Sequence, residues 1–200
     1  MKSILTLITI TFLFFGCQES SNITDPLENT TKTTFNKYPE ANYDLILLPT
    51  KAPEWQDSSF TVSKEINGDF GGFIYLNKYY IDASGNQIDI EARLTIPAHA
   101  FQGTKTITIT VDDNFAALRF SPSMTFTKNL KLYTYFSGLH LNGIKQKSLD
   151  FVYIANGGSI ELLKKKGVKI FPKWGILQVN SAELPHFSRF GWVRKQASGI

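Results

Sequence analysis

The feature that most restricts the fold of this chain is a strict alternation of apolar and polar residues. In residues 106–111 isoleucine and valine alternate with threonine, and in residues 88–96 an apolar residue occupies every second position. A period of two lines one face of an extended strand with apolar side chains, whereas a helix needs a period of about 3.6 residues. Both segments are therefore predicted to be β-strands with one buried face.

Shorter apolar runs recur along most of the remaining chain, separated by glycine, proline, asparagine or lysine. The further strands predicted from them are 60–66, 73–76, 79–82, 118–120, 124–126, 130–136, 149–154, 160–163, 168–171 and 176–179, followed by a closing run at 184–192. The 16 phenylalanines and 8 tyrosines, against 2 methionines, also favour pleated, half-buried surfaces. Many short strands without an amphipathic helix indicate an antiparallel sandwich or barrel.

Two polar segments between these strands are predicted to be exposed hairpin tips. They are Asn156-Gly157-Gly158 and the lysine run Lys164–Gly167. Glycine and asparagine tolerate the backbone conformations of tight turns. The lysines are interpreted as a solvated turn that also discourages pairing at the edge of a sheet.

The first 16 residues have the layout of a bacterial export signal. Lys2 gives a positive start, and residues 4–15 form an apolar run that is too short to be an ordinary transmembrane helix. The run ends at Gly16-Cys17 and resembles the lipobox of bacterial lipoproteins, with Phe14 and Phe15 where small or aliphatic residues are more usual. The resemblance implies cleavage before Cys17 and lipidation of Cys17. The alternative is a plain secretory signal with an incidental cysteine.

The expected lipid anchor sets an expected domain order and location. Cys17 is the only cysteine, so no internal disulfide is possible. Residues 17–42 are polar and are expected to form a flexible, lipid-anchored tether. Residues 43–57 are expected to be a connector or accessory strand, and residues 58–195 the β-sandwich. Because Gln18 and not an aspartate follows the cysteine, we expect an outer-membrane location in the bacterial cell envelope.

The charge balance and the scatter of ligand-type residues argue against several classes of function. The chain has a net charge of +4, and Lys2 is the only charge in residues 1–16, so the mature chain carries +4 − 1 = +3. This small excess predicts no nucleic-acid partner. His99, His140 and His186 lie far apart without metal-ligand spacing, and no glycine-rich loop opens a helix. We therefore expect neither a metal nor a cofactor.

Five short motifs, taken in order, give the region from Glu65 to Val193 a family resemblance. They are Gly71-Gly72, Leu94–Phe101, Thr106–Thr110, Phe120–Phe126 and His186–Phe190. In this order they resemble the ZU-five domain, the β-sandwich module of ankyrins, netrin receptors and zonula-occludens proteins, which is also common in bacterial surface lipoproteins. The resemblance implies an all-β, antiparallel β-sandwich. One departure is His99, which stands where that family usually has glycine.

The last of these motifs carries the one candidate reaction. Some ZU-five relatives, including the function-to-find domains of inflammasome proteins, cut themselves between the Phe and the Ser of a His-Phe-Ser motif. The resemblance implies that Ser188 Oγ attacks the Phe187 carbonyl while His186 takes its proton, leaving an ester that water hydrolyses. The alternative is structural: Phe187 fills the core, while His186 and Ser188 share one face of the last strand and bond neighbouring loops.

The sequence leaves three functions open. The first is a non-enzymatic, lipid-anchored interaction or scaffold module on a bacterial envelope, with an unknown protein or glycan partner. The second is the same module as a self-cleaving domain that cuts once, between Phe187 and Ser188. The third is a carbohydrate-binding surface module in which Trp55, Trp174 and Trp192 offer stacking faces.

Overall fold

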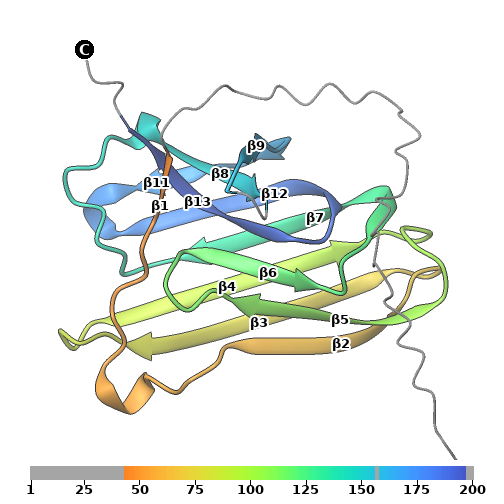
Figure 1. Cartoon of the computed structure of the whole chain (residues 1–200), viewed down its shortest axis with the longest axis horizontal. Coiled ribbons are helices and arrows are strands. Elements are labelled where there is room, and N and C mark those ends of the chain that lie inside the picture. The colour runs from red at the N-terminus through yellow and green to blue at the C-terminus, as the bar shows by residue number, and fades with distance from the viewer. Residues whose placement is uncertain (1–42, 156–157, 197–200) are drawn as a thin grey trace, which may run out of the picture. The chain divides into compact units, whose positions relative to one another are not determined.

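Two antiparallel β-sheets packed face to face form a sandwich in the computed structural model of this chain (Figure 1). The structure describes residues 43–155 and 158–196. The predicted signal peptide, Cys17, the predicted tether and the first two residues of the 156–158 hairpin tip lie outside the described residues. The all-β antiparallel sandwich expected from the alternation is confirmed.

The first sheet has seven strands. Its order is β2 (Thr61–Asn67), β5 (Thr104–Val111), β6 (Ala117–Ser121), β13 (Arg189–Lys195), β8 (Leu149–Ile154) and β9 (Ile160–Leu162), and β1 (Tyr43–Leu45) also pairs with β13. In Figure 1 this sheet lies in front, with β5, β6 and β13 turned toward the viewer. Every pairing within it is antiparallel.

The second sheet has six strands and lies behind the first. Its order is β10 (Lys165–Lys166), β12 (Ile176–His186), β7 (Thr125–Phe136), β4 (Gln87–Ile96) and β3 (Gly72–Ile81), and β11 (Lys169–Phe171) also pairs with β12. Three short 3-10 helices, Pro53–Trp55, Gln146–Ser148 and Pro172–Trp174, are the helices of the described residues. In this part of the chain, no helix is long and apolar enough to span a membrane.

The core lies between the two sheets and follows the alternation of the strands. In β4 the side chains of Ile88, Ile90, Ala92 and Leu94 are fully buried, and the residues that alternate with them face outward. Ile107 and Ile109 of β5 enter the core from the other sheet. This burial confirms the two strands predicted first. It stabilises the sandwich because burying one such side chain contributes about 1.5–3 kcal/mol.

Two strands are longer than the sequence predicted. β3 runs unbroken through Asn77 and Lys78, which pair with Glu91 and Ile90 of β4. β7 likewise replaces the two strands predicted at 124–126 and 130–136. The predicted breaks were wrong because exposed polar side chains interrupt the apolar pattern without interrupting the backbone ladder.

The lysine run was predicted to be a solvated hairpin tip. In the structure it contains a strand. Lys165 and Lys166 form β10 and pair with Ala182 and Ser181 of β12. The Nζ atom of Lys165 lies 2.8 Å from Oδ1 of Asp150, and the lysine side chain is only 14% exposed. The prediction failed because a carboxylate on β8, distant in sequence, pairs with this amine.

The closing run 184–192 is two strands that belong to different sheets. β12 ends at His186 in the six-stranded sheet, and β13 begins at Arg189 in the seven-stranded sheet. Phe187 and Ser188 carry the chain from one layer to the other. The expectation that His186 and Ser188 share one face of a last strand was therefore wrong, because an alternating pattern does not show where a chain changes sheets.

Residues 43–52, which we call the strap, join the two sheets at one end of the sandwich (Figure 1). After β1, three backbone amides of the strap donate hydrogen bonds in turn. They are Ile46 to the Trp192 carbonyl at 3.0 Å, Leu48 to Asn114 at 2.9 Å, and Ala52 to Ile81 at 2.9 Å. The first acceptor belongs to β13 and the last to β3, so the strap is bonded to both layers.

Candidate functional site

Phe187 is a core residue at the point where the chain passes from one sheet to the other, and backbone hydrogen bonds hold the chain there. The Phe187 amide donates to the Met124 carbonyl at 2.8 Å, and the Phe120 amide donates to the Ser188 carbonyl at 2.9 Å. The Phe187 ring is 2% exposed. It stacks on Phe120 with ring centroids 5.5 Å apart and meets Phe126 edge-on at 4.7 Å. These contacts place Phe187 between the two sheets.

The side chains of His186 and Ser188 are not hydrogen-bonded to each other in the described part of the chain. The His186 imidazole instead meets the Tyr153 ring edge-on, with centroids 4.6 Å apart. Self-cleavage needs a base within hydrogen-bond reach of the nucleophile and a strained peptide bond. Among described residues other than glycine, positive φ occurs at His99 alone, at 63°. Self-cleavage between Phe187 and Ser188 stays the alternative hypothesis.

The three tryptophans considered for sugar stacking do not share a surface. Trp192 is fully buried and packs edge-on against Phe151, so its proposed exposed role was wrong. Trp174 is 66% exposed and lies beside Phe171. Trp55 is half-buried against Tyr79, with ring centroids 5.5 Å apart. An apolar run does not reveal which of its aromatic residues the second sheet will cover.

A different set of aromatic side chains gathers on the outer face of the six-stranded sheet. β3 presents Tyr75 and Tyr79, which are 44% and 52% exposed, and β7 presents the half-buried Tyr133 and Tyr135. They alternate with buried residues along their strands, so all four point away from the core. We call these tyrosines, with the polar side chains between them, the tyrosine face.

β4 lies between the two tyrosine-bearing strands, and its charged side chains lie beside the tyrosines in rows perpendicular to the strands. Arg93 pairs with Tyr75 on one side and with Tyr133 on the other. Two residues before Arg93 on β4, Glu91 lies between Asn77 and Tyr135. Two residues before Glu91, Asp89 lies opposite Tyr79. Side chains directly opposite each other on adjacent strands are close enough to touch a common ligand.

Further contacts fix the positions of side chains at the rim of this face. The Tyr75 hydroxyl donates to Oε2 of Glu91 at 3.3 Å. The Arg93 guanidinium lies over the Phe73 ring, 4.6 Å from its centroid, and Lys64 lies over the same ring at 4.9 Å. Such cation–π contacts hold long side chains in place, and Nζ of Lys64 also donates to the Phe73 carbonyl at 3.0 Å.

The phenols of Tyr75 and Tyr133 are held in the neutral form. Desolvation, then the charge and the hydrogen bond of Glu91, raise the pKa of Tyr75. Desolvation, with the nearby charges of Glu91, Tyr75 and Tyr135, raises the pKa of Tyr133. A neutral phenol both donates and accepts a hydrogen bond, so each ring offers an apolar surface and a polar hydroxyl.

Two shallow depressions lie side by side on this face. One, of about 460 Å³, is lined by Tyr75, Arg93 and Lys131 among others. The second, of about 510 Å³, is lined by Tyr79, Asp89 and other residues of the same strands. Both depressions are bounded by Glu91 and Tyr133, so they adjoin each other on the face of β3, β4 and β7, and we call the two together the shallow groove.

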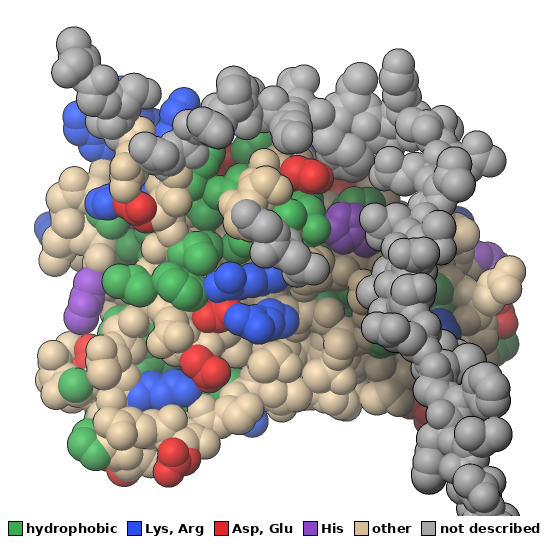
Figure 2. Space-filling model, in the orientation of Figure 1, with side chains coloured by type: hydrophobic (Ala, Val, Ile, Leu, Met, Phe, Trp, Pro, Cys, Tyr) green, Lys and Arg blue, Asp and Glu red, His purple; other side chains and the backbone are tan. Residues whose placement is uncertain are grey.

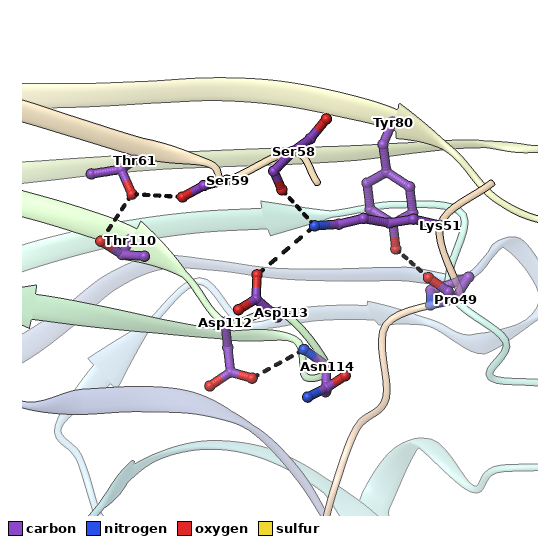
Figure 3. Close-up of polar contacts among 10 residues, drawn as sticks. All are labelled: Pro49, Lys51, Ser58, Ser59, Thr61, Tyr80, Thr110, Asp112, Asp113 and Asn114. Carbon is purple, nitrogen blue, oxygen red and sulfur yellow. Dashed lines mark hydrogen bonds and ion pairs between the residues drawn. The ribbon is translucent and has the colours of Figure 1, made fainter. Parts of the chain in front are cut away.

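Lys51, at the end of the strap, is a partly buried cation with a structural role (Figure 3). Its Nζ donates to the Ser58 carbonyl at 2.7 Å and lies 3.9 Å from Oδ1 of Asp113. The amine also lies over the Phe60 ring, 4.9 Å from its centroid. Beside it the buried Tyr80 hydroxyl donates to the Pro49 carbonyl at 2.7 Å. These contacts leave Lys51 occupied and not poised for catalysis.

Asp112 forms the centre of a second ionic cluster, on the seven-stranded sheet. Its Oδ2 atom lies 2.9 Å from the Arg189 guanidinium and 3.1 Å from that of Arg119, and Asp112 is 5% exposed. Figure 2 shows basic and acidic side chains side by side near the middle of this face. The cluster joins the β5–β6 turn to β6 and β13, which is a structural arrangement.

A larger cleft, of about 940 Å³, lies beside the strap. Apolar residues such as Leu47 and Phe115 line it. Two of its polar residues already have partners, since Arg194 lies 2.9 Å from Asp44, and His140 lies 3.7 Å from the buried Asp82. The cleft therefore has a mixed lining of apolar and polar side chains.

Comparisons with known proteins identify no relative of this chain. The scan against protein-family models, the search of curated proteins and the search of solved structures each found no match. The ZU-five resemblance stays a prediction. Within residues 43–155 and 158–196, no group of three or more His, Cys, Asp or Glu side chains is placed to hold a metal ion.

Sequence reasoning missed the tyrosine face although part of its signal was present. Tyr75 stands out of phase with Ile74 and Leu76, so it had to point to the opposite side of the same strand. Dividing residues 72–81 into two strands hid the continuation of this alternation to Tyr79. Tyr133 is more than fifty residues further on, and its place on the other side of Arg93 from Tyr75 could be known only from the sheet order.

Proposed function

We propose that this chain is a lipid-anchored protein of the bacterial cell envelope whose β-sandwich acts as a non-enzymatic interaction module. The tyrosine face is its binding surface. Lipidated Cys17 attaches the protein to the membrane, and the segment 17–42 holds the sandwich away from it. The binding surface and the anchor are thus separate parts of the chain.

The observation that supports this proposal is the gathering of four tyrosines on one outward sheet face. Tyr75 and Tyr79 leave about half of their surface exposed, and Phe73 at the rim is 47% exposed. Clustered exposed aromatic residues favour a binding surface, because covering them removes apolar area from water. Tyrosine and arginine are also enriched among residues that dominate binding energies.

Site-specific photo-crosslinking in the bacterial envelope tests the interaction module. p-Benzoylphenylalanine replaces Tyr79 in the full chain, and in a control it replaces Phe70, which is 82% exposed in the turn between β2 and β3. We expect light-dependent adducts of higher mass from position 79 and none from position 70. Equal labelling of both positions, or no adduct from either, would remove the tyrosine face as a binding surface.

Metabolic labelling tests the anchor independently of the binding surface. The full chain should incorporate radiolabelled palmitate, and the Cys17→Ser variant should not. Two or more acyl chains give stable anchoring because each buried methylene contributes about 0.8 kcal/mol. The wild-type protein should therefore sediment with outer membranes, whereas the variant should be released. If the wild-type protein is not labelled, the lipid anchor is excluded and the alternative of a plain secretory signal remains.

A further inference from the structure

We propose that the tyrosine face binds a linear chain of neutral pyranose sugars. This inference rests on the proposed function, because it names the ligand class of the same surface. It does not use the tryptophans, of which Trp192 is buried. The ligand would lie in the shallow groove on the outer face of β3, β4 and β7.

The pattern of side chains fits the two-sided chemistry of a sugar ring. A pyranose has flat faces of C–H groups and a rim of hydroxyls that both donate and accept hydrogen bonds. On the tyrosine face, aromatic rings lie next to polar groups in each row: Tyr75 beside Arg93, Tyr79 beside Asp89, and Tyr135 beside Glu91. The rings offer surfaces for the C–H faces, and the polar groups offer partners for the hydroxyls.

The balance of charges indicates a neutral sugar. Asp89 and Glu91 supply hydrogen-bond acceptors, and Arg93 and Lys131 supply donors. Glu91 borders both depressions, whereas Asp89 borders only the second, and Arg93 and Lys131 only the first. Two acidic and two basic groups leave no net charge to attract a polyanion or a polycation. An acidic polysaccharide would meet the carboxylates of Glu91 and Asp89 in the groove, which disfavours it.

The length of the groove indicates an oligosaccharide and not a single sugar. Tyr75 and Tyr79 are four residues apart on one strand, a distance on the order of 13 Å at about 3.3 Å per residue. An open, shallow groove on a rigid sheet can receive a chain along its length, with both chain ends continuing into solvent.

Isothermal titration with defined hexasaccharides tests this inference. The protein is the full chain with Cys17→Ser, and the probes are cellohexaose, mannohexaose and xylohexaose, with hexagalacturonate as the acidic comparison. We expect at least one neutral probe to bind more tightly than hexagalacturonate. Tyr75→Ala and Tyr133→Ala should each weaken that binding by about tenfold, as expected for the loss of one ring contact.

Matched variants separate stacking from folding. Tyr133→Phe keeps the ring and should change affinity only a few-fold, and Phe70→Ala removes an exposed ring outside both depressions and should change nothing. Because Tyr133 is half-buried, its alanine variant is used only if its thermal unfolding midpoint matches that of the wild type. The exposed Tyr75→Ala variant supplies the same test without that risk.

Each outcome supports or overturns a defined statement. Binding of a neutral hexasaccharide that depends on Tyr75 supports the inference. No binding to any neutral probe, preferential binding of hexagalacturonate, or binding that Tyr75→Ala leaves unchanged overturns it. If no sugar binds but a crosslinked adduct still forms at position 79, the sugar inference fails and the interaction module stands. If both experiments fail, the proposed function fails too.

Discussion

At the scale of single residues, Lys51 shows how this fold keeps a cation under its surface. The amine donates to the Ser58 carbonyl and lies over the Phe60 ring, and its side chain is 12% exposed. We expect Lys51→Ala to lower the free energy of unfolding by about 1–3 kcal/mol, because the buried Ser58 contact and the packing of the lysine stem are both lost. Urea unfolding followed by circular dichroism measures this loss.

Two further variants show which part of Lys51 matters. Lys51→Met keeps most of the apolar stem and should recover part of the stability, whereas Lys147→Ala, at an exposed lysine, should stay within about 0.5 kcal/mol of the wild type. An unchanged midpoint for Lys51→Ala would show that the strap is held without this contact.

The residues His186 and Ser188 give a second test at this scale. Their side chains are not hydrogen-bonded to each other in the part of the chain that the structure describes, and Phe187 between them is buried. We expect purified full-length chain to show a single uncut species by intact mass spectrometry. Two fragments that meet between Phe187 and Ser188, and that disappear in Ser188→Ala, would instead establish self-cleavage.

At the scale of elements, the turn between β3 and β4 is built around Asp82. Its Oδ1 atom accepts hydrogen bonds from the backbone amides of Ser84 at 2.8 Å and Asn86 at 2.7 Å. Burial alone would raise the pKa of Asp82, but the hydrogen bonds from Asn86 and Ser84, with the charge of His140, outweigh it and lower the pKa. The ionised carboxylate therefore stabilises the folded state.

This direction of shift predicts an acid dependence of stability. Because the pKa of Asp82 is lower in the folded chain than the unfolded value of about 3.9, its contribution is complete above that pH and is lost as the pH falls through the folded pKa. The wild type should be more stable than Asp82→Asn at neutral pH, and the gap should close below about pH 4. Urea titrations at a series of pH values measure the gap.

The exposed Asp69, in the turn between β2 and β3, supplies the control for this experiment. Asp69→Asn should not reproduce the pH-dependent gap. A gap for Asp82→Asn that stays constant from neutral pH to pH 3 would contradict the role of the ionised carboxylate in holding the turn.

The elements that the sequence predicted best are those with one face buried and one face polar. β4 and β5 were predicted within one or two residues because isoleucines alternate there with polar residues. β12 and β13 were merged, because the pattern remains extended and apolar through Phe187 while the chain changes sheets. Hydrogen bonds of Phe187 and Ser188 to distant Met124 and Phe120 fix that crossing, and such pairings are not encoded locally.

The candidate site was harder to predict than the fold for a related reason. A tyrosine in a strand is equally compatible with the core and with the outer face, as buried Tyr80 and exposed Tyr79 show in adjacent positions. Only the sheet order β3–β4–β7 brings Tyr75 and Tyr133 to opposite sides of Arg93. The motif at His186 was visible in the sequence, but whether its side chains meet depends on where the two strands separate.

At the scale of the whole molecule, Phe187 is one of the rings that hold the two sheets together. It contacts Phe120 of β6 and Phe126 of β7, which belong to different layers. Phe187→Ala should lower the free energy of unfolding by about 3–5 kcal/mol, because a cavity would remain between the sheets. Urea unfolding measures this, and the smaller change Phe187→Leu should cost less.

An exposed phenylalanine controls for the chemistry of the substitution. Phe70→Ala should leave stability within about 0.5 kcal/mol, since that ring is 82% exposed. Equal effects of Phe70→Ala and Phe187→Ala would show that the buried ring cluster does not carry the packing between the layers.

The strap also determines how the sandwich would respond to mechanical load. A pull that enters at Tyr43 reaches β13 through β1 and the Ile46 amide, then the β5–β6 turn through Leu48, and finally β3 through Ala52. The tension is therefore divided between both layers before it reaches the interior of either sheet. β3 is also the strand that carries Tyr75 and Tyr79, so force from a ligand and force from the N-terminal side would meet on the same strand.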